Sequence, residues 1–159
     1  MIISSTLTGA IIANYQNAYL IIPALVGFLP MIMNTGGNSG SQTSTLVIRG
    51  MALGEIKLKD FAKVLFKELR VALLVGFILA IFNFGRIYLL NGDFLLAFVV
   101  AITLYFTVIM AKILGFMMPM LAKALKLDPA LMSAPLISTI VDALSVLFYF
   151  TTVTLVFNI

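Results

Sequence analysis

Apolar stretches long enough to cross a lipid bilayer recur along this chain of 159 residues, and they constrain its fold more than any other feature. A helix needs about 20 mostly apolar residues to span the hydrocarbon core. Hydrophobic residues make up 62% of the sequence and charged residues only 10%, a composition unlike that of a soluble domain. We therefore expect an all-α membrane protein that forms a single domain over residues 1–159.

Five helical segments account for these stretches. They cover residues 2–16, 19–46, 69–90, 94–125 and 129–157. The first is short for a membrane span, and an amphipathic stretch precedes the third. The fourth is expected to be interrupted near Gly115 and Pro119, where helix-breaking residues occur.

Basic residues gather between the second and third segments and between the fourth and fifth. They are Arg49, Lys57, Lys59, Lys63, Lys67, Arg70, Lys123 and Lys126. The positive-inside rule places both loops in the cytoplasm, whereas the turn at residues 91–93 carries no Lys or Arg. We therefore expect a plasma-membrane protein with a cytoplasmic N-terminus and an extracytoplasmic C-terminus.

The absence of two residue types excludes several kinds of chemistry. The chain has no cysteine and no histidine, so it cannot form a disulfide, a thiolate metal site or a histidine-based catalytic triad. Its net charge of +4 is small and scattered, unlike the basic surface of a nucleic-acid-binding protein. We expect neither an enzyme nor a nucleic-acid partner.

One polar, glycine-rich run stands out within this apolar sequence. Residues 34–43 read Asn-Thr-Gly-Gly-Asn-Ser-Gly-Ser-Gln-Thr. Gly36 and Gly40 form a GxxxG motif, which allows close helix packing. Polar backbone and side chains survive at membrane depth only when they are buried in protein or line a wet cavity. Ten residues wrap almost three helical turns, and this density favours a path-lining role over a single packing stripe.

Two acidic residues are candidates for a cation site. Asp128 precedes Pro129, so it is either the N-cap of the fifth helix or a carboxylate at the mouth of an ion path. Asp142 follows fourteen residues later, which on one continuous helix puts both acids on roughly one face. Pro135 and Thr139 fall near that face, and Pro135 leaves the carbonyl of Leu131 without its helical donor.

A lysine within the fourth segment needs a partner or water. Counted from the turn between the fourth and fifth segments, Lys112 and Asp142 lie at similar depths. We therefore consider a buried Lys112–Asp142 pair, with a Lys112 that snorkels or faces a wet cavity as the alternative.

Several motifs together resemble the signature of MgtE-type magnesium channels over nearly the whole chain. The motifs occupy residues 30–42, 49–55 and 127–131, with Lys67, Glu68, Gly115, Pro119, Pro135 and Asp142 between and after them. The resemblance implies a homodimer of five-helix subunits whose second and fifth helices line a pore on the two-fold axis. It also implies that Asp128, one from each subunit, forms the central magnesium site.

The residues agree with this resemblance, because the two polar helices are the second and fifth, and ten helices can enclose a pore. Candidate pore residues are Gly36, Gly37, Asn38, Gln42, Leu131, Pro135, Thr139 and Asp142. Uncharged groups would guide a largely hydrated Mg²⁺. An oxygen-only site would also admit Mn²⁺, Co²⁺ or Ca²⁺.

Three departures from the family pattern leave other readings open. Full-length relatives carry cytosolic N-terminal and CBS domains, so either gating differs here or this chain is the pore portion alone. Lys112 stands where the family usually has a neutral residue, and Gln16 replaces a common Glu. The alternatives to a passive channel are a sodium-coupled magnesium exporter and a non-conducting membrane subunit.

Overall fold

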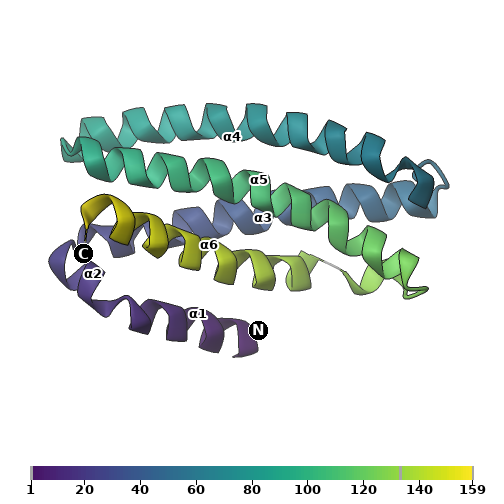
Figure 1. Ribbon diagram of the computed structural model, residues 1–159, viewed down its shortest axis with the longest axis horizontal. Helices are drawn as coiled ribbons and strands as arrows, with labels where there is room; N and C mark the ends of the chain where they lie inside the picture. The colour runs from purple at the N-terminus through teal and green to yellow at the C-terminus, as the bar shows by residue number, and fades with distance from the viewer. Residues whose placement is uncertain (1, 133, 159) are drawn as a thin grey trace.

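The structure is a computed structural model that describes residues 2–132 and 134–158, and these residues form helices and no strand (Figure 1). The α-helices are α1 (Ile2–Asn14), α2 (Gln16–Ile21), α3 (Ala24–Ala52), α4 (Phe61–Asn91), α5 (Phe94–Ala124) and α6 (Ala134–Phe157). Two short 3₁₀ turns, η1 (Leu58–Asp60) and η2 (Pro129–Leu131), precede α4 and α6. The expected all-α class is confirmed.

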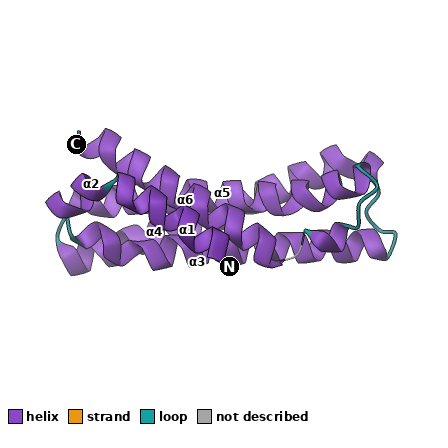
Figure 2. Ribbon diagram, turned by 90° about the horizontal axis from the view of Figure 1, so that it is seen from below, coloured by secondary structure: helices purple, strands orange, loops and turns teal. Residues whose placement is uncertain are grey.

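The four long helices α3, α4, α5 and α6 run along the long axis of the molecule, and α1 packs beside α6 (Figure 1). The loop between α3 and α4 and residues 125–131 lie at one end, which we call the basic end because most Lys and Arg side chains belong to it. The α4–α5 turn, α2 and the C-terminus lie at the opposite end, as Figure 2 also shows.

Among the described residues, α5 and α6 are long and apolar enough to cross a membrane by length and composition. Helix α1 has 13 residues and is about 20 Å long at 1.5 Å per residue, shorter than the hydrocarbon core of about 30 Å. The expectation of five spans therefore stays a prediction.

Helix boundaries follow local signals that the sequence carries. At the α4–α5 turn, Gly92 adopts φ +69°, a left-handed conformation that glycine enters without strain. Asp93 then caps α5 by accepting a hydrogen bond from the backbone N–H of Leu96 at 3.0 Å. Helix α5 continues through Pro119 to Ala124, so the interruption expected there is absent. A proline removes only one helical hydrogen bond, and tight packing of this buried segment against α3 holds the helix together.

Three predicted segments differ from the structure. The second, expected over residues 19–46, is divided between α2, which ends at Ile21, and α3, which runs from Ala24 to Ala52. Helix α4 is continuous from Phe61 to Asn91, because no proline separates the amphipathic stretch from the apolar one. The fifth segment is broken: η2 ends at Leu131 and α6 begins at Ala134. A continuous helix would lose a hydrogen bond at Pro135, whereas a helix that begins at Ala134 places this proline in its first turn, where no donor is needed.

The core has one large apolar cluster toward the opposite end and a smaller one near the basic end. The first packs α3, α5 and α6 together through Leu25, Leu104 and Phe150, and it holds Tyr149, whose hydroxyl donates to the carbonyl of Leu25 at 3.1 Å. The second contains Val47, Met51, Phe116 and Met120. The polar run of α3 lies between these clusters, so it is held in place from both sides.

Candidate functional site

A hollow of about 420 Å³ that is lined by both polar and apolar groups lies between α3 and α6, and we call it the α3–α6 hollow. Its lining residues are Pro30, Met33, Asn34, Gly37, Asn38, Ser138 and Asp142. The polar run of α3 supplies one wall and the first half of α6 supplies the other. Amide, hydroxyl and carboxylate groups therefore face the same space, as hard cations require.

Asp142 is the charged group of the α3–α6 hollow. A Cβ atom added to Gly37 would lie 3.2 Å from its Oδ1 and 3.2 Å from Ser138 Oγ. Glycine at position 37 thus lets the carboxylate approach the backbone of α3 closely. Within the described residues the Asp142 carboxylate accepts no hydrogen bond and pairs with no cation. It is the open acceptor of this hollow.

The two asparagines lie on the α3 side of the hollow. Asn38 Nδ2 donates to Asn34 Oδ1 at 3.1 Å, so the two amides one turn apart form a connected polar surface. Each amide keeps unused donor and acceptor positions. Gly37 and Asn38, two of the predicted pore residues, line this hollow together with Asp142, and their role in a pore stays a prediction.

Ser41 of the polar run and Ser44 directly after it have a different role, because they bind the backbone that leads into α6. Ser44 Oγ donates to the carbonyl of Met132 at 2.8 Å, and Ser41 Oγ donates to the carbonyl of Ala134 at 3.3 Å. Ser41 Oγ also lies 3.3 Å from Ser138 Oγ. The Ser44 hydroxyl satisfies the carbonyl of Met132, which lies outside α6, and the Ser41 hydroxyl adds a second acceptor contact at the first residue of α6.

The GxxxG motif is a packing contact in this structure. A Cβ on Gly36 would lie 2.7 Å from Thr107 Cγ2 and 2.8 Å from Val141 Cγ1. A Cβ on Gly40 would lie 2.8 Å from Ile137 Cγ2, and one on Gly115 would meet the Gly40 carbonyl. The polar run therefore combines both readings of the sequence: its glycines pack against α5 and α6, and its asparagines face the hollow.

Asp128 lies apart from the α3–α6 hollow. It is exposed, and its Oδ1 accepts a hydrogen bond from the backbone N–H of Ala130 at 2.9 Å, which caps η2. Because the chain breaks between η2 and α6, Asp128 and Asp142 do not share one helix. The expectation that fourteen residues put both acids on one helix face is therefore wrong.

The other predicted pore residues are divided between α6 and the surface. Thr139 Oγ1 donates to the carbonyl of Pro135 at 2.8 Å, so its hydroxyl is used within its own helix. Leu131 and Gln42 are exposed, and neither lines the α3–α6 hollow.

Lys112 is paired with Glu68 rather than with Asp142. Its Nζ lies 3.7 Å from Glu68 Oε2 and donates to Thr43 Oγ1 at 3.2 Å. The expected pair fails because the two residues lie at different levels of α3: Asp142 contacts α3 at Gly37 and Lys112 at Thr43. Six residues separate these positions, which is about 9 Å along a helix.

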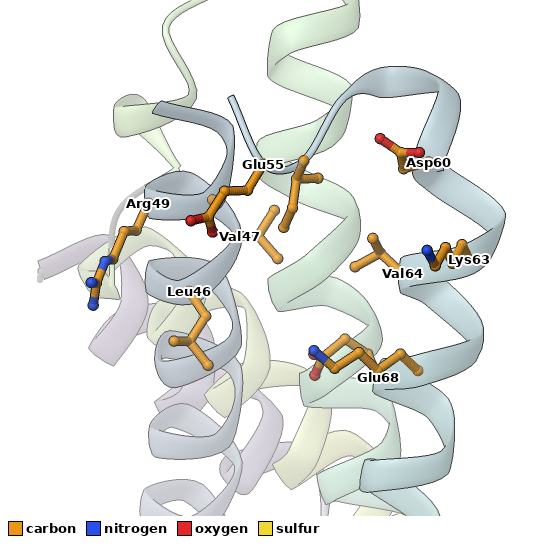
Figure 3. Close-up of a pocket in the computed structure, with 11 residues that line it drawn as sticks. Leu46, Val47, Arg49, Glu55, Asp60, Lys63, Val64 and Glu68 are labelled. Atoms are coloured by element: carbon orange, nitrogen blue, oxygen red, sulfur yellow. The ribbon is translucent and has the colours of Figure 1, made fainter. Parts of the chain in front are cut away.

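A larger hollow of about 530 Å³ lies at the basic end, between α3, the following loop and α4 (Figure 3). Arg49, Glu55, Asp60, Lys63, Lys67 and Glu68 supply its charged lining. Three acids and three bases line it together, and among the described residues no group of three acidic side chains is close enough to hold a metal ion.

Ser138 was not among the predicted site residues, and Glu68 was named only within the family motifs, without its contact with Lys112. Ser138 could have been found, because it precedes Asp142 by four residues and so shares its helix face. Glu68 carried no comparable signal, since its contact with Lys112 joins α4 to α5 across the bundle.

An all-helical bundle with two membrane-compatible helices and an uncharged polar run beside a lone carboxylate has the features of an ion-transporting membrane protein. Residues 29–152 match the family MgtE, described as "Divalent cation transporter". The chain belongs to this family, which confirms the resemblance seen in the sequence.

Curated relatives agree with this assignment. The chain is 36% identical over 149 residues to "Magnesium transporter MgtE" of Thermus thermophilus, covering 94% of this chain and 33% of the relative. It is 35% identical over 144 residues to the protein of the same name from Bacillus subtilis, covering 91% and 32%. The chain thus spans about a third of the length of the curated relatives it matches.

Proposed function

We propose that this chain forms the membrane pore of a magnesium channel, in which two copies place α3 and α6 around a path on their two-fold axis. The observation that carries the proposal is the open Asp142 carboxylate, which lines a hollow together with the Asn34 and Asn38 amides. The names of the curated relatives support magnesium as the ion.

The chemistry of the hollow suits a hydrated divalent cation. Mg²⁺ gives up its water reluctantly and is commonly held by one or two carboxylates with several waters retained. One Asp142 from each of two subunits would supply two negative charges, and the amides would contact the hydration shell. Neutral amides attract the ion too weakly to trap it, as conduction requires.

We further propose a change of role for Asp128. The expectation that Asp128 of each subunit binds the central ion stays a prediction, and in the single chain Asp128 is exposed and caps η2 near the basic end. A carboxylate there offsets the positive end of η2 and attracts cations to the entrance. In this proposal Asp142 binds the ion, and Asp128 attracts cations to the entrance of the path.

The pairing of Lys112 bears on the alternative of a non-conducting subunit. That reading requires the lysine charge to act on the ion path. Lys112 is instead held by Glu68 and Thr43, and the Lys112 and Glu68 side chains are only 12% and 13% exposed. The neutralised pair leaves Asp142 as the net charge of the path.

Magnesium flux into liposomes tests this function. We compare wild type with Asp142→Asn and Asp128→Asn, and use Asp93→Asn at the opposite end as the control for a lost carboxylate. We expect Asp142→Asn to lower flux by roughly tenfold or more, which is the cost of about 1.4 kcal/mol, and Asp128→Asn to lower it less.

Unchanged flux in a well-folded Asp142→Asn protein would refute the proposed site. Flux that depends on a sodium gradient would refute the channel in favour of an exchanger. Saturation alone does not separate the two mechanisms, so the gradient dependence is the measurement that matters.

A further inference from the structure

A basic hollow of about 420 Å³ lies on α4, apart from the α3–α6 hollow, and we call it the α4 basic hollow. Its lining consists of Lys63, Phe66, Lys67, Arg70 and Val71. The three cations follow one another at spacings of four and three residues, so they share one face of the helix. Their side chains belong to exposed residues.

The cations of the α4 basic hollow form no direct ion pair with any described residue, although Lys63 and Lys67 also line the larger hollow with Glu55, Asp60 and Glu68. Within the described residues, no carboxylate forms an ion pair with Lys63, Lys67 or Arg70. The acids closest in sequence are already used: Glu68 pairs with Lys112 at 3.7 Å, and Asp60 Oδ2 accepts from the backbone N–H of Lys57 at 3.0 Å. Three cations therefore face the surface together.

The same helix face continues as an exposed apolar surface. Phe66 is 65% exposed and Leu74, one turn beyond Arg70, is 66% exposed. Phe77 and Ile81 continue this surface along α4. A ligand that fits both parts must carry a negative charge at one end and an apolar chain at the other.

The position of the hollow along α4 indicates where such a ligand comes from. Helix α4 ends at Asn91, 21 residues beyond Arg70 (91 − 70 = 21), which is a length of about 31 Å. That length matches the hydrocarbon core of a bilayer, about 30 Å. If α4 spans the membrane as proposed, Arg70 lies at its boundary, and Lys67 and Lys63 lie at headgroup level.

We propose that the α4 basic hollow binds the phosphate headgroup of an anionic phospholipid from the leaflet at the basic end, with the acyl chains against Phe66 and Leu74. Basic pockets at this level are suited to anionic headgroups, and Lys and Arg form short, charge-assisted hydrogen bonds with phosphate. This inference goes beyond ion transport, and it rests on the proposed membrane placement of α4 but not on the identity of the ion.

Native mass spectrometry of the purified full chain, titrated with phosphatidylglycerol or phosphatidylcholine of the same acyl chains, tests the proposal. The variant Lys63→Gln/Lys67→Gln/Arg70→Gln removes the hollow's charge. The matched control Lys57→Gln/Lys59→Gln/Lys126→Gln removes the same charge elsewhere at the basic end. We expect wild type and control to prefer phosphatidylglycerol, and the hollow variant to lose this preference by a factor on the order of a hundred.

The outcomes separate a lipid site from general attraction. Equal loss of preference in both triple variants would overturn the proposal, because the charges would then act without a defined site. Inorganic phosphate that displaces the lipid at equal concentration would also overturn it, since the apolar surface would then contribute nothing. If the triple variant does not fold, Lys67→Gln alone is expected to weaken phosphatidylglycerol binding about fivefold, and an unchanged affinity there would refute the site.

Discussion

Lys112 shows how a charged side chain is accommodated within an apolar helix bundle. Its ammonium group meets the Glu68 carboxylate and the Thr43 hydroxyl, so groups from α5, α4 and α3 converge at one point. A buried ion pair of this kind adds little net stability, but removal of one partner leaves the other charge buried and unpaired. The two positions are therefore strongly coupled.

We predict that Lys112→Met destabilises the protein by about 3 kcal/mol, because Glu68 would remain buried without a partner. The double variant Lys112→Met/Glu68→Met is expected to regain most of this stability. Thermal unfolding in detergent measures both, and Lys123→Met on the same helix, without an ion-pair partner in the described structure, is the control. A Lys112→Met protein as stable as the control would contradict the pair.

Among the contacts between helices, the approach of α5 to α3 at Gly115 and Gly40 is the closest one that depends on glycine. A side chain on Gly115 would run into the backbone carbonyl of Gly40, which cannot rotate away as a flexible side chain can. The approach fixes how far α3 lies from α5, and α6 packs against the same stretch of α3. The shape of the α3–α6 hollow thus depends on a contact outside it.

We predict that Gly115→Ala destabilises the bundle by about 1–3 kcal/mol, because the two helices must separate to admit the methyl group. Gly85→Ala on α4 is the matched control, since a Cβ there meets nothing within 4 Å, and alanine's higher helix propensity makes it neutral or stabilising by up to about 1 kcal/mol. Thermal unfolding in detergent compares the melting temperatures of the two variants. Equal melting temperatures would refute the close crossing.

The elements show which parts of the fold could be read from the sequence. The Gly92–Asp93 turn and the apolar length of α5 are local signals, and the expected boundaries of 94–125 agree with α5 to one residue. The break before α6 also has a local cause in Pro135, although Asp128 and Pro129 gave an equally good start signal earlier in the chain. Both positions are suitable helix starts, and the packing of the bundle decides which of them begins α6.

The site was less predictable than the helices. Gly37, Asn38 and Asp142 were identified because polar residues in an apolar chain are conspicuous. The predicted partner of Lys112 was wrong. Counting depth from a turn assumes straight, continuous helices. The break before α6 shifts Asp142 by several residues relative to α5. Contacts between distant helices depend on such offsets, which no local pattern carries.

For the whole molecule, the two ends differ in charge and so define a direction across a membrane. The basic end holds the α3–α4 loop, and the opposite end holds the α4–α5 turn (Figure 1). The positive-inside rule assigns the basic end to the cytoplasm. This orientation is open to direct measurement.

We predict that a cysteine at Lys59 is modified only from the cytoplasmic side and a cysteine at Asn91 only from outside. Both residues are exposed, and the chain has no native cysteine, so the wild type serves as an unlabelled control. A membrane-impermeant maleimide applied to right-side-out and inverted vesicles reports the result. Labelling of both positions from one side would exclude the proposed topology.

The serine contacts of α3 also have a consequence for how the protein is made. Ser41 and Ser44 donate to backbone carbonyls 93 and 88 residues further along the chain. During synthesis α3 emerges long before these acceptors exist. We therefore expect Ser41 and Ser44 to gain these partners only once α6 is made, so ribosome-bound chains that stop before Ala134 are expected to leave this stretch of α3 more accessible to water-soluble reagents than chains that include α6.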